Sequence, residues 1–105
     1  MSTDDLRAYA AQWDHPLDLG IVRAVKVLRE HHIATTECCE GGEGHSAHVP
    51  SVWFGGSPGE AWKAVGVLLD HQLPLRSLSA CWTISYGCLP EGPEWLVEFT
   101  EKLAI

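Results

Sequence analysis

The chain lacks any long apolar run. None of its 105 residues belongs to an apolar stretch near the roughly 20 residues that cross a bilayer as a helix. The first five residues, Met1 to Asp5, lack the basic and apolar regions of a signal peptide. We therefore expect one cytoplasmic domain spanning residues 1–105, with no membrane association.

Positive charge is also scarce. Lys and Arg together number 7 against 14 Asp and Glu, which gives a formal net charge of −7. An acidic surface repels phosphate, so direct nucleic-acid binding is not expected. An acidic protein has the same sign of charge as a phosphate backbone and competes for basic grooves on nucleic-acid enzymes. The charge balance thus favours a protein partner over a nucleic acid.

The tight spacings of common metal and phosphate motifs are missing. The sequence has no Cys-x2-Cys or His-x3-His pair, which structural zinc sites usually show. Its glycine-rich segment, residues 41–44, has no Lys within it and precedes a strand pattern rather than a helix pattern. This order differs from that of phosphate-binding loops, in which a helix follows the glycines.

What the sequence does contain is clear apolar periodicity. It predicts helices over residues 3–13, 16–32 and 57–72, and strands over residues 33–38, 51–54, 78–86 and 94–100. The short connections within each strand pair favour hairpins. We therefore expect an α+β fold. It is a two-layer sandwich in which a four-stranded, mainly antiparallel sheet carries two helices on one face, in the order αββαββ, after a short N-terminal helix.

Two of these elements carry specific expectations. In the helix at 57–72, Ser57 is a good N-cap and Pro58 suits the first helical position. A close neighbour is expected at Gly66, in mid-helix, and the predicted buried face comprises Ala61, Trp62, Val65, Leu68 and Leu69. In the strand at 51–54, Trp53 points away from Val52 and Phe54, which makes it a candidate anchor for a partner.

Reactive groups concentrate in one segment, residues 36–50. It combines two thiols, two imidazoles, three carboxylates and three glycines, namely Cys38, Cys39, His45, His48, Glu37, Glu40, Glu43, Gly41, Gly42 and Gly44. Glycine allows sharp turns and close approach to the main chain. From this segment and the following strand we select six candidates for ligand or partner binding: Cys39, Glu40, Gly42, Gly44, His45 and Trp53.

Four interpretations of this segment remain open. Cys39, His45 and His48 are candidate zinc ligands, because zinc takes thiolate and imidazole groups. Cys39 and His45 form a candidate thiolate–imidazole pair for nucleophilic catalysis. The backbone of residues 41–45 is a candidate anion site. In the fourth interpretation the glycines only connect two strands, and Glu40 and His45 brace the connection.

The same residues carry a resemblance. The segment Thr35 to His45, the pattern Pro50-x-Val52-x-Phe54, residues 59–64 and Leu73-Pro74-Leu75 resemble short uncharacterised proteins encoded by bacteriophages and their bacterial hosts. The most specific part is the Cys-Glu-Gly-Gly-x-Gly-His core at residues 39–45. The resemblance implies a phage or prophage accessory gene and brings no assigned chemistry.

Charge, size and resemblance together favour a small acidic protein-binding module. We expect a phage-encoded modulator or inhibitor of a host protein, such as a defence or nucleic-acid-processing complex, which contacts it through Trp53 or residues 37–48. An alternative is a metal- or small-ligand-binding, enzyme-like domain that uses the loop between Cys39 and His45. A third is a homodimer formed across the open face of the sheet.

Overall fold

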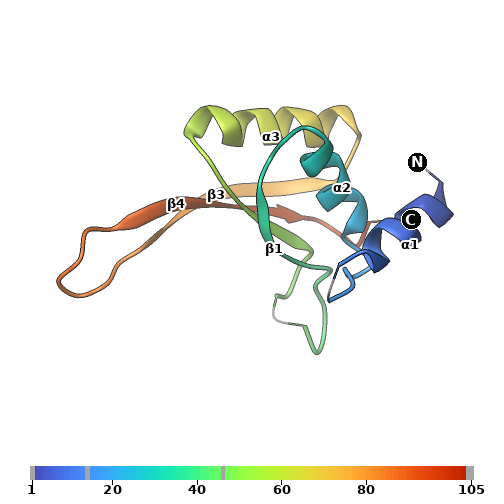
Figure 1. Ribbon diagram of the computed structural model, residues 1–105, viewed down its shortest axis with the longest axis horizontal. Helices are drawn as coiled ribbons and strands as arrows, with labels where there is room; N and C mark the ends of the chain where they lie inside the picture. Colours follow the sequence, from blue (N-terminus) through green and yellow to red (C-terminus); the bar gives the residue numbers. More distant parts are fainter. Residues whose placement is uncertain (1, 14, 46, 104–105) are drawn as a thin grey trace.

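The computed structural model describes residues 2–13, 15–45 and 47–103 (Figure 1). Along the chain it contains α1 (Thr3–Ala11), α2 (Val22–Glu30), β1 (Thr35–Cys39), β2 (Ser51–Gly55), α3 (Pro58–Asp70), β3 (Leu75–Thr83) and β4 (Glu91–Phe99). Each helix and strand expected from the sequence is present, and their order is the predicted one.

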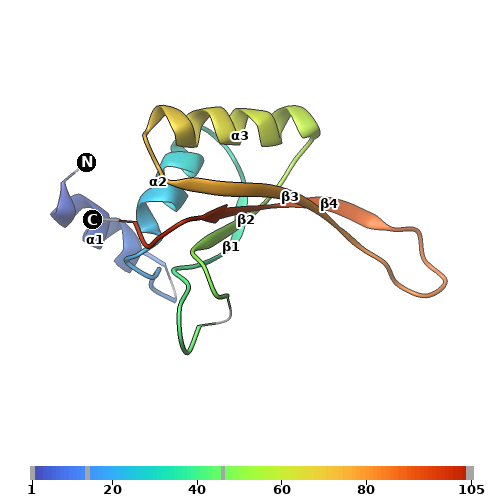
Figure 2. The same ribbon diagram turned by 180° about the vertical axis from the view of Figure 1, so that it is seen from behind.

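The four strands form one sheet in the order β1-β2-β4-β3, and every neighbouring pair is antiparallel. Helices α2 and α3 contact each other and pack against the sheet, α2 at β1 and α3 at β3. Figures 1 and 2 show α3 lying along one side of the sheet, while α1 sits beside α2 near both chain ends. The α+β fold class predicted from the sequence is confirmed.

Local chemistry explains where two helices begin. The Ser57 side chain accepts a hydrogen bond from the Glu60 N–H at 3.2 Å, and Pro58 occupies the first turn of α3. At α1, Ser2 and Asp5 form a capping box, in which each side chain accepts from the other residue's backbone N–H. Both starts follow from short-range patterns that the sequence shows directly.

The core lies between the sheet and the two packed helices. Val52 and Phe54 of β2 and Val97 and Phe99 of β4 are fully buried on the same sheet face, because alternate strand residues share a side. The helices contribute a matching set of buried apolar residues, namely Ala24, Val25, Leu28, Ala61, Ala64 and Leu68. Ile21, the residue before α2, is buried in the same core.

The helix predicted over residues 16–32 is shorter than expected. It begins at Val22, and residues 16–21 form an irregular connection instead. Tertiary contacts hold this connection, since the Gly20 carbonyl accepts from the Leu103 N–H at 2.9 Å and the Leu17 N–H bonds to the Ala10 carbonyl. A β-carbon at Gly20 would lie 2.7 Å from the Glu40 carboxylate. The sequence prediction was wrong here because Glu40 and Leu103, the neighbours of Gly20, are distant in the chain.

The buried face predicted for α3 was wrong in part. Ala61 and Leu68 are buried, but Trp62 is 71% and Leu69 54% exposed. Only Ala61, Ala64 and Leu68 of α3 are buried, so the helix contacts the core along a narrow stripe that leaves Trp62 and Leu69 outside. Nothing lies within 4 Å of a β-carbon built at Gly66, so the expected close neighbour is absent among the described residues.

Strands β3 and β4 are each nine residues long, whereas β1 and β2 have five. The β3–β4 hairpin therefore extends past the sheet and the helices, as both views show (Figures 1 and 2). We call residues 82–90, at the far end of this hairpin, the hairpin tip. No helix within the described ranges is long and apolar enough to cross a membrane.

Candidate functional site

The loop between β1 and β2 spans residues 40–50, and its described part, residues 40–45 and 47–50, is held by its own backbone. Gly41 adopts a φ of +78°, and a β-carbon there would lie 2.4 Å from the Val49 carbonyl carbon. The Gly42 N–H donates to the His48 carbonyl at 3.2 Å, and the His45 N–H donates to the Gly42 carbonyl. The glycines thus allow this segment to fold back tightly, as the sequence indicated.

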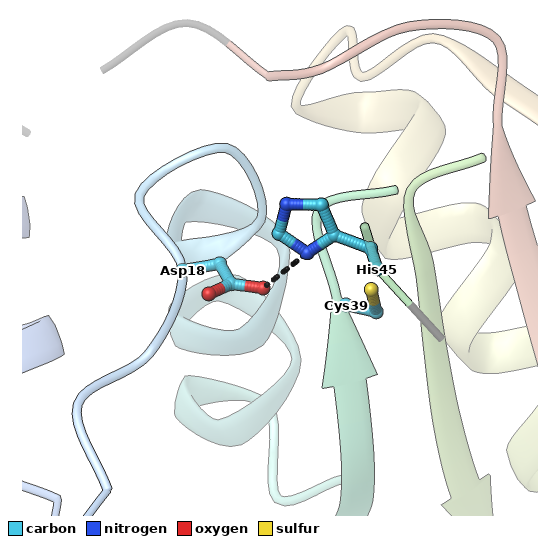
Figure 3. A group of neighbouring side chains, drawn as sticks. All are labelled: Asp18, Cys39 and His45. Carbon is cyan, nitrogen blue, oxygen red and sulfur yellow. Dashed lines mark ion pairs between the residues drawn. The ribbon is translucent and has the colours of Figure 1, made fainter. Parts of the chain in front are cut away.

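Two predicted site residues, Cys39 and His45, lie close together in the structure, and Asp18 joins them. One potential ligand atom each from Asp18, Cys39 and His45 lies within 4.8 Å of the others. Figure 3 shows the His45 ring directed toward the Asp18 carboxylate, with the Cys39 sulfur nearby. His45 Nδ1 and Asp18 Oδ2 are 3.7 Å apart, which is longer than an N–H···O hydrogen bond. These three residues form the Asp18–Cys39–His45 cluster.

Backbone N–H groups orient two members of this cluster. The Glu40 N–H donates to Asp18 Oδ2 at 3.2 Å, and the Gly41 N–H donates to Cys39 Sγ at 3.4 Å. Cys39 is 7% exposed, so its sulfur is held in a defined position. Hydrogen bonds of this kind stabilise negative charge on a carboxylate or a thiolate.

The remaining loop candidates lie around the cluster rather than in it. Glu40 Oε2 lies 3.4 Å from Lys102 Nζ, in a partly exposed ion pair. Gly42 and Gly44 have positive φ values, and a β-carbon at Gly44 would meet nothing within 4 Å. His48 is exposed, and its imidazole is not part of the cluster found among the described residues. The third potential ligand is Asp18 instead.

Trp53 lies on the sheet face opposite the helices, as its alternation with Val52 and Phe54 predicts. It is half-buried in a hollow of about 310 Å³ on this face. The other lining residues are Glu37, Cys38, Cys39, Ala47, Ser51, Leu96 and Glu98. Trp53 is therefore a recessed aromatic beside two carboxylates, rather than a protruding one.

Cys38 points to the opposite side from Cys39 and packs against the core. Burial raises the pKa of the Cys38 thiol to about 11, with smaller contributions from Asp18 and Cys39 and an opposing one from Arg29. At neutral pH this thiol stays protonated, and a protonated thiol is a poor nucleophile and a poor ligand. Cys38 is therefore a structural residue.

We expect Cys88 to react with iodoacetamide much faster than Cys38 at pH 8. Cys88 is exposed, whereas Cys38 is partly buried and its pKa is raised. The lower thiolate fraction alone slows the reaction of Cys38 with iodoacetamide on the order of 100-fold. Peptide mass spectrometry over a time course measures both rates in one sample. Equal rates at the two cysteines would contradict the packing described for Cys38.

Sequence reasoning missed two features. Asp18 lies 22 residues before Glu40, in a segment assigned to a helix, and only the folded chain brings the two together. The exposed hairpin tip was missed as well, although the two last strand patterns are longer than the first two. This difference in length was the available signal, because two strands that extend beyond their neighbours also extend beyond the helices that cover the sheet.

The three comparisons with known proteins add no relative. No family model, curated protein or solved structure matches this chain.

Proposed function

We propose that this protein is a small acidic protein-binding module whose contact surface is the hairpin tip. The observation that carries the proposal is the exposure of four large apolar side chains on one projecting hairpin: Trp82, Ile84, Tyr86 and Leu89. Ile84 is 71% and Leu89 is 87% exposed. Clustered apolar side chains of this size on a surface are typical of a protein–protein contact.

The shape and charge of the hairpin define the kind of partner. Residues 77–101 contain four glutamates and no Lys or Arg. All four glutamates follow the tip, on the β4 side of the hairpin. A narrow apolar hairpin with one acidic side complements an apolar groove that carries basic side chains along one edge. The partner is therefore a different protein that offers such a groove.

Charge also distinguishes this partner from a second copy of the chain. Two copies that meet at their hairpins would bring together chains of net charge −7, with glutamates flanking both tips. Like charges placed opposite each other oppose association. We therefore favour a basic-rimmed partner over a homodimer.

The phage-like resemblance of residues 35–45 supports a narrower form of the proposal. In this form the partner is a host protein, such as a defence or nucleic-acid-processing enzyme, and the module modulates or inhibits it in the cytoplasm. A basic groove that normally holds phosphate matches the hairpin in charge. Trp53 and residues 37–48, which the sequence analysis selected as contacts, are the second candidates for the surface that meets the partner.

Replacing three tip residues tests the proposal. In the variant Ile84→Ser/Tyr86→Ser/Leu89→Ser, we expect affinity for the partner to fall at least about 100-fold, because each buried side chain contributes roughly 1.5–3 kcal/mol. The partner is first captured from a host extract with wild-type protein, then purified. Isothermal titration measures its stoichiometry and affinity at two salt concentrations.

The matched control removes exposed apolar side chains elsewhere. Trp62→Ser/Leu69→Ser changes two exposed residues of α3 and is expected to bind as wild type does. Affinity should also weaken with added salt, because basic and acidic groups meet at the rim. The proposal fails if no protein binds stoichiometrically, or if Trp53→Ala or the α3 control abolishes binding while the tip variant does not.

A further inference from the structure

The Asp18–Cys39–His45 cluster joins a residue from the connection before α2 to two residues at the end of β1 and in the loop that follows it. Asp18 lies in the connection before α2, Cys39 ends β1, and His45 lies in the β1–β2 loop. Carboxylate, thiolate and imidazole are the three side-chain groups that bind zinc in proteins. Their convergence distinguishes this cluster from a group of acidic residues alone or a single cysteine.

We propose that Asp18, Cys39 and His45 bind one zinc ion. Bonds of about 2.1 Å to oxygen and nitrogen place these two atoms roughly 3.4 Å apart in a tetrahedron. Asp18 Oδ2 and His45 Nδ1 are 3.7 Å apart, and all three ligand atoms lie within 4.8 Å of one another. Side-chain movements of about 1 Å therefore complete the coordination geometry.

Groups beyond the three ligands fit the same role. Metal ligands are usually held by hydrogen bonds from an outer shell, which fix their orientation. Here the Glu40 N–H donates to the Asp18 carboxylate, and the Gly41 N–H donates to the Cys39 sulfur. Both donors come from the tight turn that Gly41 allows. The loop thus orients the ligands through its backbone.

Access and charge also suit a cation. His45 and Asp18 are 31% and 38% exposed, which leaves a path for the ion, while Cys39 forms the buried side of the site. Two further carboxylates, Glu37 of β1 and Glu43 of the loop, add negative charge on this side of the chain. Three protein ligands leave the fourth tetrahedral position to water or to a group from another molecule.

A zinc ion bound here would cross-link two irregular segments of the protein. An ion at this position connects the 16–21 connection to the end of β1 and to the 40–50 loop. A ligand that binds only the folded state stabilises it, so zinc should raise the melting temperature. This inference does not depend on the hairpin contact, which lies on another part of the molecule.

Metal titration tests the proposal. We expect chelator-treated wild-type protein to bind one equivalent of Zn²⁺ in competition with a chromophoric chelator. We expect Co²⁺ to give the visible bands of a tetrahedral ion together with thiolate-to-cobalt charge-transfer absorption. In Cys39→Ser and in Asp18→Asn, zinc affinity should fall by more than the roughly 10–100-fold typical of outer-shell changes. Cys39→Ser should also remove the charge-transfer absorption.

His48→Gln and Cys88→Ser serve as matched controls, since they replace an exposed imidazole in the same loop and an exposed thiol elsewhere. Both should bind zinc as wild type does. Asp18→Asn keeps an oxygen to accept the Glu40 N–H, so it tests the ligand without removing that hydrogen bond. The proposal is overturned by wild-type protein that binds no stoichiometric zinc, by cobalt spectra without thiolate absorption, or by equal losses in the controls.

Discussion

Gly41→Ala should lower the free energy of unfolding by about 3 kcal/mol or more. Its φ of +78° is strained for any residue with a side chain, at a cost of roughly 1–3 kcal/mol. In addition, the new methyl group would lie 2.4 Å from the Val49 carbonyl carbon and 2.6 Å from the Pro50 nitrogen. These atoms are backbone, so the loop itself must move to accept the change.

Gly44→Ala is the matched control for this prediction. Gly44 has a similar φ of +81°, but a β-carbon there meets nothing within 4 Å. Only the conformational cost remains, roughly 1–3 kcal/mol, so the loss should be smaller than at Gly41. Urea denaturation measures both variants on the same scale. Equal losses would contradict the close approach of Gly41 to residues 49 and 50.

Leu68→Ala should lower the free energy of unfolding by about 2–5 kcal/mol, whereas Leu89→Ala should change it by less than about 0.5 kcal/mol. The substitution is chemically the same, but Leu68 is fully buried on the core-facing side of α3 and Leu89 is 87% exposed at the hairpin tip. The first leaves a cavity in the core and the second removes a side chain from solvent.

The same denaturation experiment checks this contrast, with circular dichroism to show that each variant is folded. Leu69→Ala adds an intermediate case, since Leu69 lies next to Leu68 but is 54% exposed. A loss at Leu89 as large as that at Leu68 would mean that the hairpin tip folds back onto the protein. In that case the tip would not be a free contact surface.

Features set by neighbouring residues could be predicted from the sequence. The Ser57-Pro58 helix start, the pairing of the last two strands and the orientation of Trp53 all depend on local chemistry or on strand alternation. The apolar residues of β2 and β4 identified the core face for the same reason. The fold class followed from these elements and their short connections.

Features set by distant partners could not be predicted. Residues 16–21 have helix-compatible spacing, but Gly20 is held by Leu103 and covered by Glu40. The contribution of Asp18 to the cluster depends on this irregular connection, so it was not visible in the sequence. Likewise, which of the apolar residues of α3 face the sheet depends on the crossing angle, which periodicity does not specify.

The hairpin tip and the Asp18–Cys39–His45 cluster lie on different parts of the molecule. The tip is built from β3 and β4, whereas the cluster is built from residues before α2 and around the end of β1. Variants at one site should therefore leave the other unchanged. This separation allows partner binding and zinc binding to be tested independently in the same protein.

Site-specific photo-cross-linking in cells that produce the protein tests the proposed protein-binding role most directly. A photo-reactive amino acid in place of Tyr86, which is fully exposed at the tip, should give one discrete adduct with a different protein. The same amino acid in place of Lys63, on the exposed side of α3, should give none. Adducts only between copies of this chain, or equal adducts from both positions, would contradict the proposed contact.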